Sequence, residues 1–190
     1  AFLDDARAGN LPQVSWIVGT TPASEHPPSP PALGEDYTAQ CLAAVMANER
    51  AWAKTLFVYH YDEHGGFFDH VPPPTPEPGT ADEFVDGQPI GLGIRVPAVI
   101  ASPFSRGGRV VSDTFDHTST LLLLERRFGV EVPNLSQWRR DTVGDLTSTL
   151  DFSAPDPSVP ALPDTAARAE AVSCTALPVP EPPATQALPT

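Results

Sequence analysis

Positive charge is scarce in this chain. Its 190 residues include 24 acidic but only 11 basic side chains, Lys54 being the single lysine, and the formal net charge is -13. A protein of this charge repels polyanions, and the sequence has no basic stripe that could follow the phosphates of a nucleic acid. We therefore expect no nucleic-acid partner.

Long hydrophobic runs and cysteines are also few. The longest apolar run, "TLLLLERR", is far too short to span a bilayer, so the sequence predicts no transmembrane segment. The two cysteines, Cys41 and Cys174, allow one disulfide or none, and neither lies in a metal-ligand spacing such as C-x-x-C. The cysteine content therefore does not indicate a redox compartment.

Proline is abundant instead, with 24 residues, and it helps to predict the domain organisation. A chain of this length suits one domain with a sizeable core. Proline removes a backbone donor and restricts the residue before it, so the proline-rich stretches 20–34 and 71–93 are expected to be loops. We expect residues 1–153 to form the folded part. Residues 154–190, rich in Pro and Ala, should form a largely irregular tail, because they carry too little bulky apolar surface to offset the entropy of ordering.

Segments of strand and helix character alternate along the folded part. The strand-forming runs are β-branched or aromatic and almost continuously apolar, whereas the helical segments carry acids at their starts or glycine at their ends. Strands are predicted at 14–19, 55–60 and 94–104, and helices at 35–52 and 112–130, with a further helix ending near Gly9. This order is typical of an α/β fold whose parallel sheet lies between helical layers. Such sheets bind ligands beyond the carboxyl ends of their strands.

The segment "YDEHGGFFDHVPPP", residues 61–74, follows a predicted strand at such an end. Asp62 and Glu63 are adjacent carboxylates, and like charges this close repel unless a cation neutralises them. A divalent metal would do so. Oxygen ligands suit Mg, Ca or Mn, while His60 and His64 also permit Zn or Fe, so the identity of the metal stays open. The alternative is that the segment is a solvated turn with capping acids.

Three further histidines have alternative interpretations. His26, in a proline-rich loop, could contact a phosphate or donate a proton near neutral pH, or it could simply be an exposed loop residue. His117 follows Asp116 at the start of a predicted helix and could serve only to cap that helix. His70 with Asp69 could support a site or be solvated.

Three segments of the chain together resemble one family. "TLFVYHYDEHGGFFDHVPPP", "SEHPP" upstream of it and "FDHTSTLLLLERRFG" downstream are similar to the bacterial phosphoesterase family that contains non-haemolytic and haemolytic phospholipases C and a related acid phosphatase. The likeness extends over roughly residues 11–150. It implies an alkaline-phosphatase-like α/β/α sandwich and the hydrolysis of phosphate esters, either phospholipids or small phosphomonoesters.

The same resemblance implies roles for single residues. Asp62 and Glu63 would be ligands of a divalent metal that holds the phosphate. His26 would be the catalytic histidine that faces the phosphoryl group. Three further residues of the shared segments would support these groups without an assigned contact to the substrate. They are Glu25, which precedes His26 in the sequence, and His64 and His117.

The chain departs from the family at its beginning. Family members carry an upstream segment of the type E-N-R-S/T-F-D with further metal ligands, followed by a Ser or Thr nucleophile, and neither is present here. Thr20 and Thr21 are interpreted as loop residues. We therefore expect the C-terminal part of a phosphoesterase, with the nucleophile in an N-terminal half that this chain lacks; the alternative is a non-catalytic remnant or binding module with a partial metal site. Many relatives are exported, which implies an extracellular or periplasmic location; a signal peptide would lie in the N-terminal part that is expected to be missing here.

Overall fold

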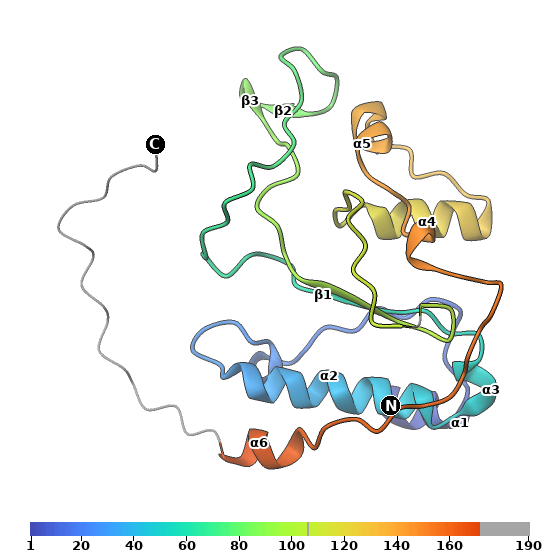
Figure 1. Ribbon diagram of the computed structural model, residues 1–190. Coiled ribbons are helices and arrows are strands. Elements are labelled where there is room, and N and C mark those ends of the chain that lie inside the picture. The colour runs from blue at the N-terminus through green and yellow to red at the C-terminus, as the bar shows by residue number, and fades with distance from the viewer. Residues whose placement is uncertain (106, 172–190) are drawn as a thin grey trace. The chain divides into compact units, whose positions relative to one another are not determined.

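The computed structural model describes residues 1–105 and 107–171 (Figure 1). Cys41 is buried, while Cys174 lies outside the described residues, so the choice between one disulfide and none stays a prediction. The chain divides into two compact units. The first unit comprises Ala1–Ser15 and Cys41–Ala161, and the second comprises Trp16–Gln40 and the chain from Leu162 onward.

The helix predicted at 35–52 is in fact two helices. Helix α2 (Pro31–Met46) begins within the proline-rich stretch, because proline at the first helical position lacks only an N–H that the helix does not use. It ends at Met46, and Asn48 then caps the short helix α3 (Glu49–Trp52), its Oδ1 accepting a hydrogen bond of 3.0 Å from the N–H of Ala51. None of the described helices is both long and apolar enough to cross a membrane.

Glycines end two other helices at the predicted positions. Helix α1 (Phe2–Ala8) ends at Gly9, with φ of 72°, and helix α4 (Ser119–Phe128) ends at Gly129, with φ of 67°, both in the left-handed conformation that glycine adopts easily. Helix α4 starts later than predicted: residues 112–116 form no helix, and His117 and Thr118 form a turn. The remaining helices are α5 (Gln137–Thr142), α6 (Ala166–Ala171) and the 3₁₀ turns η1 (Thr21–Ala23) and η2 (Thr147–Thr149).

The strands form two antiparallel pairs. Strand β1 (Phe57–His60) pairs with β4 (Ala98–Ala101), with His60 opposite Ala98. Strands β2 (Phe84–Val85) and β3 (Gln88–Pro89) form a small hairpin, which lies between β1 and β4 in the sequence. In Figure 1 the chain extends from the β1–β4 pair to this hairpin and returns. The prediction of a parallel sheet is therefore wrong for the described residues. A parallel pair needs a crossover, usually a helix, and the segment between β1 and β4 contains none.

The strand predicted at 14–19 is also wrong. These residues contain no strand, and Val18 among them is 87% exposed. A β-forming composition gives a strand only where a neighbouring strand supplies hydrogen bonds, and none of the described strands pairs with this segment. The described residues thus form a mixed α and β structure with few, short strands.

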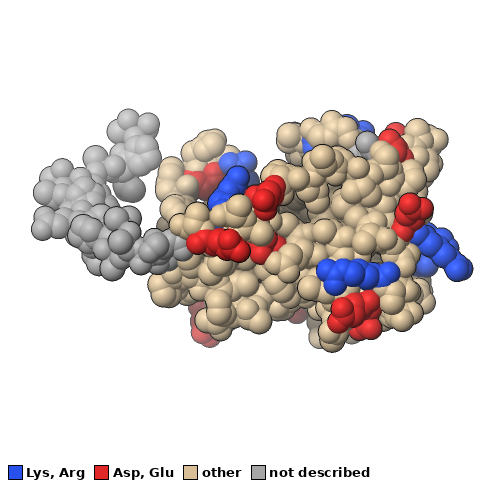
Figure 2. Space-filling model, turned by 90° about the horizontal axis from the view of Figure 1, so that it is seen from below, with Lys and Arg blue, Asp and Glu red and all other residues tan. Residues whose placement is uncertain are grey.

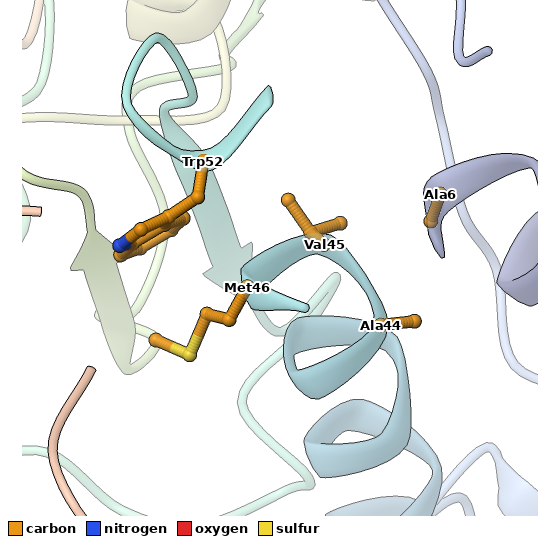
Figure 3. Close-up of a cluster of buried hydrophobic side chains, with 5 residues drawn as sticks. All are labelled: Ala6, Ala44, Val45, Met46 and Trp52. Carbon is orange, nitrogen blue, oxygen red and sulfur yellow. The ribbon is translucent and has the colours of Figure 1, made fainter. Parts of the chain in front are cut away.

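The core of the first unit lies where its helices meet. Ala6 of α1, the end of α2 and Trp52 of α3 are buried together, as Figure 3 shows. The members contributed by α2 are Ala44, Val45 and Met46. Burying a large apolar side chain such as Met46 stabilises the fold by about 1.5–3 kcal/mol. Asn48 adds a polar contact at this edge, because its Nδ2 donates a hydrogen bond of 3.0 Å to the carbonyl of Arg7.

In the second unit, polar contacts join α6 to the start of α2. Thr165 donates a hydrogen bond of 2.8 Å to Asp36, and Arg168 forms an ion pair of 2.8 Å with Glu35. Both residues of the ion pair are substantially exposed, so it contributes at most about 1 kcal/mol. Basic side chains likewise lie beside acidic ones on the face shown in Figure 2.

Candidate functional site

The predicted metal ligands Asp62 and Glu63 lie on a tight turn that follows β1. The carboxylate of Glu63 accepts a hydrogen bond of 2.6 Å from the N–H of Gly65. Gly65 and Gly66 have φ of 69° and 74°, a conformation that residues with a Cβ adopt only at a cost. Asp62 is exposed, and its carboxylate makes no hydrogen bond or ion pair with any part of the chain that the structure describes. One carboxylate therefore shapes the turn and the other is open to a ligand.

These two carboxylates fit a divalent metal as part of a coordination sphere. Their oxygens suit hard cations, but such ions take roughly four to eight ligands. Within residues 1–105 and 107–171, no group of three or more His, Cys, Asp or Glu side chains is arranged to hold a metal ion. The predicted neighbour His64 has its Nδ1 3.9 Å from Oε2 of Glu63, beside the carboxylate.

Two histidines meet at the backbone carbonyl between β1 and this turn. Nδ1 of His60 lies 3.0 Å and Nε2 of His117 lies 2.9 Å from the carbonyl oxygen of Tyr61. Their ring centroids are 4.9 Å apart in an edge-to-face arrangement. Because a carbonyl oxygen only accepts, each of these nitrogens carries the hydrogen of its bond. The structure thus brings His117, distant in sequence, to the residue that precedes Asp62.

The residue at the cap position of α4 is Thr118, and it makes no side-chain capping hydrogen bond. Oδ1 of Asp116 accepts hydrogen bonds from the N–H and hydroxyl of Thr118, at 2.8 and 2.6 Å, at the start of α4. Asp116 thus fixes Thr118, the residue before α4, while the ring of His117 contacts the Tyr61 carbonyl.

A buried charge network that the sequence did not reveal includes Asp116, the residue before His117. Arg139 of α5 donates from Nε and Nη2 to Glu83, at 3.1 and 2.7 Å, and from Nη1 to Oδ2 of Asp116, at 2.6 Å. Glu83 is only 2% exposed and also accepts a hydrogen bond from Ser136. Burial favours the neutral guanidine, but the bonds to Glu83 and Asp116 outweigh it, so the pKa of Arg139 is raised. Nη2 also donates a hydrogen bond of 3.1 Å to the carbonyl oxygen of Gly91.

The proline-rich segment 71–93, which the sequence predicts to be a long loop, is fixed at its base. Asp69 before it receives two hydrogen bonds from Arg95 after it, at 2.6 Å from Nε and 2.8 Å from Nη2. These bonds hold the pKa of Asp69 well below its usual range. His70, the other partner considered for Asp69, is exposed, and its Nδ1 lies 3.7 Å away. With Glu83 buried in the middle of this segment, the structure holds it at several points.

The predicted catalytic residue His26 belongs to the second unit, whereas Asp62 and Glu63 belong to the first. His26 is exposed on the loop after η1, and its Nδ1 donates a hydrogen bond of 2.8 Å to the carbonyl of Pro27. A neutral ring in this tautomer keeps a lone pair on Nε2. Glu25 has φ of 62°, and its side chain lies against Gly34, where an added Cβ would come within 2.1 Å of Cγ of Glu25. Its pairing with His26 stays a prediction.

Comparison with known proteins decides the family. Residues 1–131, more than half of the chain, match the model of the phosphoesterase family. This chain belongs to the phosphoesterase family. The match includes the turn after β1, the loop with His26 and the start of α4, and it confirms the resemblance expected from the sequence.

The relatives of this chain include bacterial and plant proteins. The chain is 50% identical over 175 residues to phospholipase C B of Mycobacterium tuberculosis, covering 85% of this chain and 34% of the relative. It is 45% identical over 212 aligned positions to the non-hemolytic phospholipase C of Pseudomonas aeruginosa, covering all of this chain and 31% of the relative. Non-specific phospholipase C3 of Arabidopsis thaliana is 28% identical over 180 residues. The chain is thus homologous to phospholipases C and spans about a third of their length.

Proposed function

We propose that this chain is part of a metal-dependent phosphoric ester hydrolase of the phospholipase C type. The observation that carries the proposal is the turn at Asp62 and Glu63, where one carboxylate is open to a ligand, in a chain homologous to phospholipases C. Its substrate would be a phospholipid or a smaller phosphate monoester. Small glycines beside the carboxylates let a phosphate group approach the backbone.

The residues of this chain would divide the work. Asp62 and Glu63 would supply part of the ligands of a divalent metal, which, when bound, polarises a phosphoryl oxygen. His26 would move a proton through Nε2, because the Pro27 carbonyl holds the hydrogen on Nδ1. The Ser or Thr nucleophile and the remaining ligands would come from the part of such enzymes that this chain does not span.

The proposal extends to architecture and location. We infer an alkaline-phosphatase-like sandwich of which residues 1–153 are the C-terminal part, followed by the tail 154–190, on the strength of the family match. In this arrangement the pair β1–β4 would join further strands, since an isolated two-stranded sheet is marginal in water. Export to the cell surface or medium is expected from the family and is checked by fractionating the source cells.

A chimera tests the proposed function. The chain replaces the matching segment of phospholipase C B from Mycobacterium tuberculosis, and hydrolysis of p-nitrophenylphosphorylcholine and p-nitrophenyl phosphate is measured with and without divalent metals. We expect metal-dependent turnover by the chimera and none by the isolated chain. Asp62→Asn should abolish the turnover of the chimera, while Asp86→Asn, an exposed acid of the β2–β3 hairpin, should not.

Two outcomes would contradict the proposal. A folded chimera without turnover on either substrate would indicate the non-catalytic alternative. Metal-dependent turnover by the isolated chain would show that the nucleophile lies within these residues.

A further inference from the structure

One guanidinium group connects three separated parts of the first unit. Arg139 of α5 contacts Glu83 and the carbonyl of Gly91 in the segment between β1 and β4, and it contacts Asp116 before α4. Its side chain is 12% exposed, and those of its two carboxylate partners are 2% and 8% exposed. Buried charges of this kind hold their partners in defined positions, because losing a contact leaves a charge without water or a counter-ion.

The contact with Asp116 leads directly to the site. Asp116 uses one oxygen for Arg139 and the other for the start of α4, so its position is set from two sides. The next residue, His117, then places its ring on the Tyr61 carbonyl, at 2.9 Å. Tyr61 is followed by Asp62. The chain of contacts from Arg139 to the open carboxylate therefore contains only hydrogen bonds and peptide bonds.

We propose that Arg139 is a positioning residue of this site. By holding Asp116 it fixes His117 on the Tyr61 carbonyl. Through that carbonyl it fixes the start of the turn that carries Asp62 and Glu63. The inference rests on the proposed function in treating this turn as the site, and it adds a residue that lies beyond the matched family region, which ends at residue 131.

The geometry requires arginine at this position. The planar fork presents Nε and Nη2 to one carboxylate while Nη1 reaches a second carboxylate on another side. A lysine is a single compact charge and cannot hold both carboxylates in this geometry. Arg139→Lys therefore keeps the charge and removes the fixed orientation of Asp116.

The neighbouring Arg140 provides a matched control. It lies on the same helix and pairs bidentately with Glu125, at 2.7 and 2.9 Å, but Glu125 lies in the C-terminal half of α4, away from Asp116 in sequence. Arg140→Lys disturbs an equivalent ion pair. Its hydrogen bonds go to Glu125, Val132 and Leu135, so Arg140 contacts neither Asp116 nor His117 directly.

The experiment reads the ring of His117 directly. The full 190-residue chain is labelled with ¹⁵N, and long-range ¹H–¹⁵N spectra are recorded near pH 8, where histidines with an ordinary pKa are neutral. The signals of His117 are assigned from their loss in His117→Asn. The wild-type chain should show the tautomer with hydrogen on Nε2, which the Tyr61 carbonyl requires.

Arg139→Lys should shift the His117 tautomer ratio by roughly fivefold, as expected for the loss of one ordinary hydrogen bond. Asp116→Asn should do the same. Asp116→Asn serves as a second variant because its amide oxygen can still accept the hydrogen bond from Thr118, so the start of α4 is retained. Arg140→Lys should leave the ratio unchanged. Thermal melts of each variant report whether it is folded.

An unchanged His117 spectrum in folded Arg139→Lys or Asp116→Asn would overturn the positioning role. An equal change in Arg140→Lys would also overturn it, because the effect would then follow general destabilisation. The spectra need neither metal nor substrate. A shifted ratio in a chain whose chimera lacks turnover would therefore refute the proposed function and leave the positioning role standing.

Discussion

Removing the cation from the buried network should destabilise the protein more than removing an anion. Glu83, Arg139 and Asp116 together carry two negative charges and one positive charge. Arg139→Leu leaves two carboxylates, 2% and 8% exposed, with no cation between them. Glu83→Gln leaves Arg139 paired with Asp116, and the amide oxygen can still accept from Arg139.

The expected magnitudes follow from these two end states. Breaking a buried ion pair by removing one partner costs about 3–5 kcal/mol, and we expect Arg139→Leu to fall in this range. In Glu83→Gln, the acceptor becomes neutral while Arg139 stays charged. Each hydrogen bond should then be weaker by about 1 kcal/mol, so the expected loss in the free energy of unfolding is about 1–2 kcal/mol. Since native domains are stable by only about 5–15 kcal/mol, Arg139→Leu should lose a large part of the total.

Urea unfolding followed by tryptophan fluorescence measures both losses. With a slope of about 2 kcal/mol per molar urea, Arg139→Leu should lower the unfolding midpoint by roughly 2 M and Glu83→Gln by less than 1 M. Equal shifts for the two variants, or a shift below about 0.5 M for Arg139→Leu at unchanged slope, would refute the charge reasoning.

Three further predictions concern stability away from the site. Asn48→Ala should lower the free energy of unfolding in urea by about 1–2 kcal/mol, because it removes both the cap of α3 and the hydrogen bond to the Arg7 carbonyl. Asn48→Asp keeps the cap and should lower this free energy less. The hydrogen bonds from Arg140 lower the pKa of Glu125 from its usual 4.5 to about 2, so their stabilisation is present above pH 4.5 and is lost as the pH falls toward 2. Melting temperatures between pH 5 and 2 should therefore fall less steeply for Glu125→Gln than for the wild type, and parallel curves would contradict this. Deleting residues 154–190 should lower the melting temperature by only a few degrees, because the ion pair of α6 is exposed and the hydrogen bond of Thr165 to Asp36 is only partly buried. A failure of the shortened chain to fold would contradict this.

Local features of this chain could be predicted from its sequence. The turn at Asp62–Gly66 was expected from a strand followed by acids and two glycines, and the end of α4 from Gly129, because each depends on neighbouring residues alone. The direction of the sheet could not be predicted in the same way. A strand such as 98–101 has the same composition in a parallel or an antiparallel pair, and the path of the chain between the strands decides which forms.

The network around Arg139 escaped prediction for a related reason. Glu83, Asp116 and Arg139 are far apart in the sequence, and an arginine in a short helix resembles any solvated surface charge. Burial of Glu83 follows only from the tertiary fold. The role of His117 was hidden with it, since a histidine after an aspartate at a helix start is equally compatible with capping.

The contacts that hold segment 71–93 affect how the length and sequence of this segment can vary. The Asp69–Arg95 pair closes this segment at its base, and Glu83 divides it into two loops of about a dozen residues each. Around Gly79 the first of these loops is open, with no atom within 4 Å of an added Cβ. Residues inserted there would lengthen a loop whose two ends are already fixed, at a small entropic cost. Sequence change can therefore accumulate in this loop while the Asp69–Arg95 pair and the buried Glu83 keep its two ends in place.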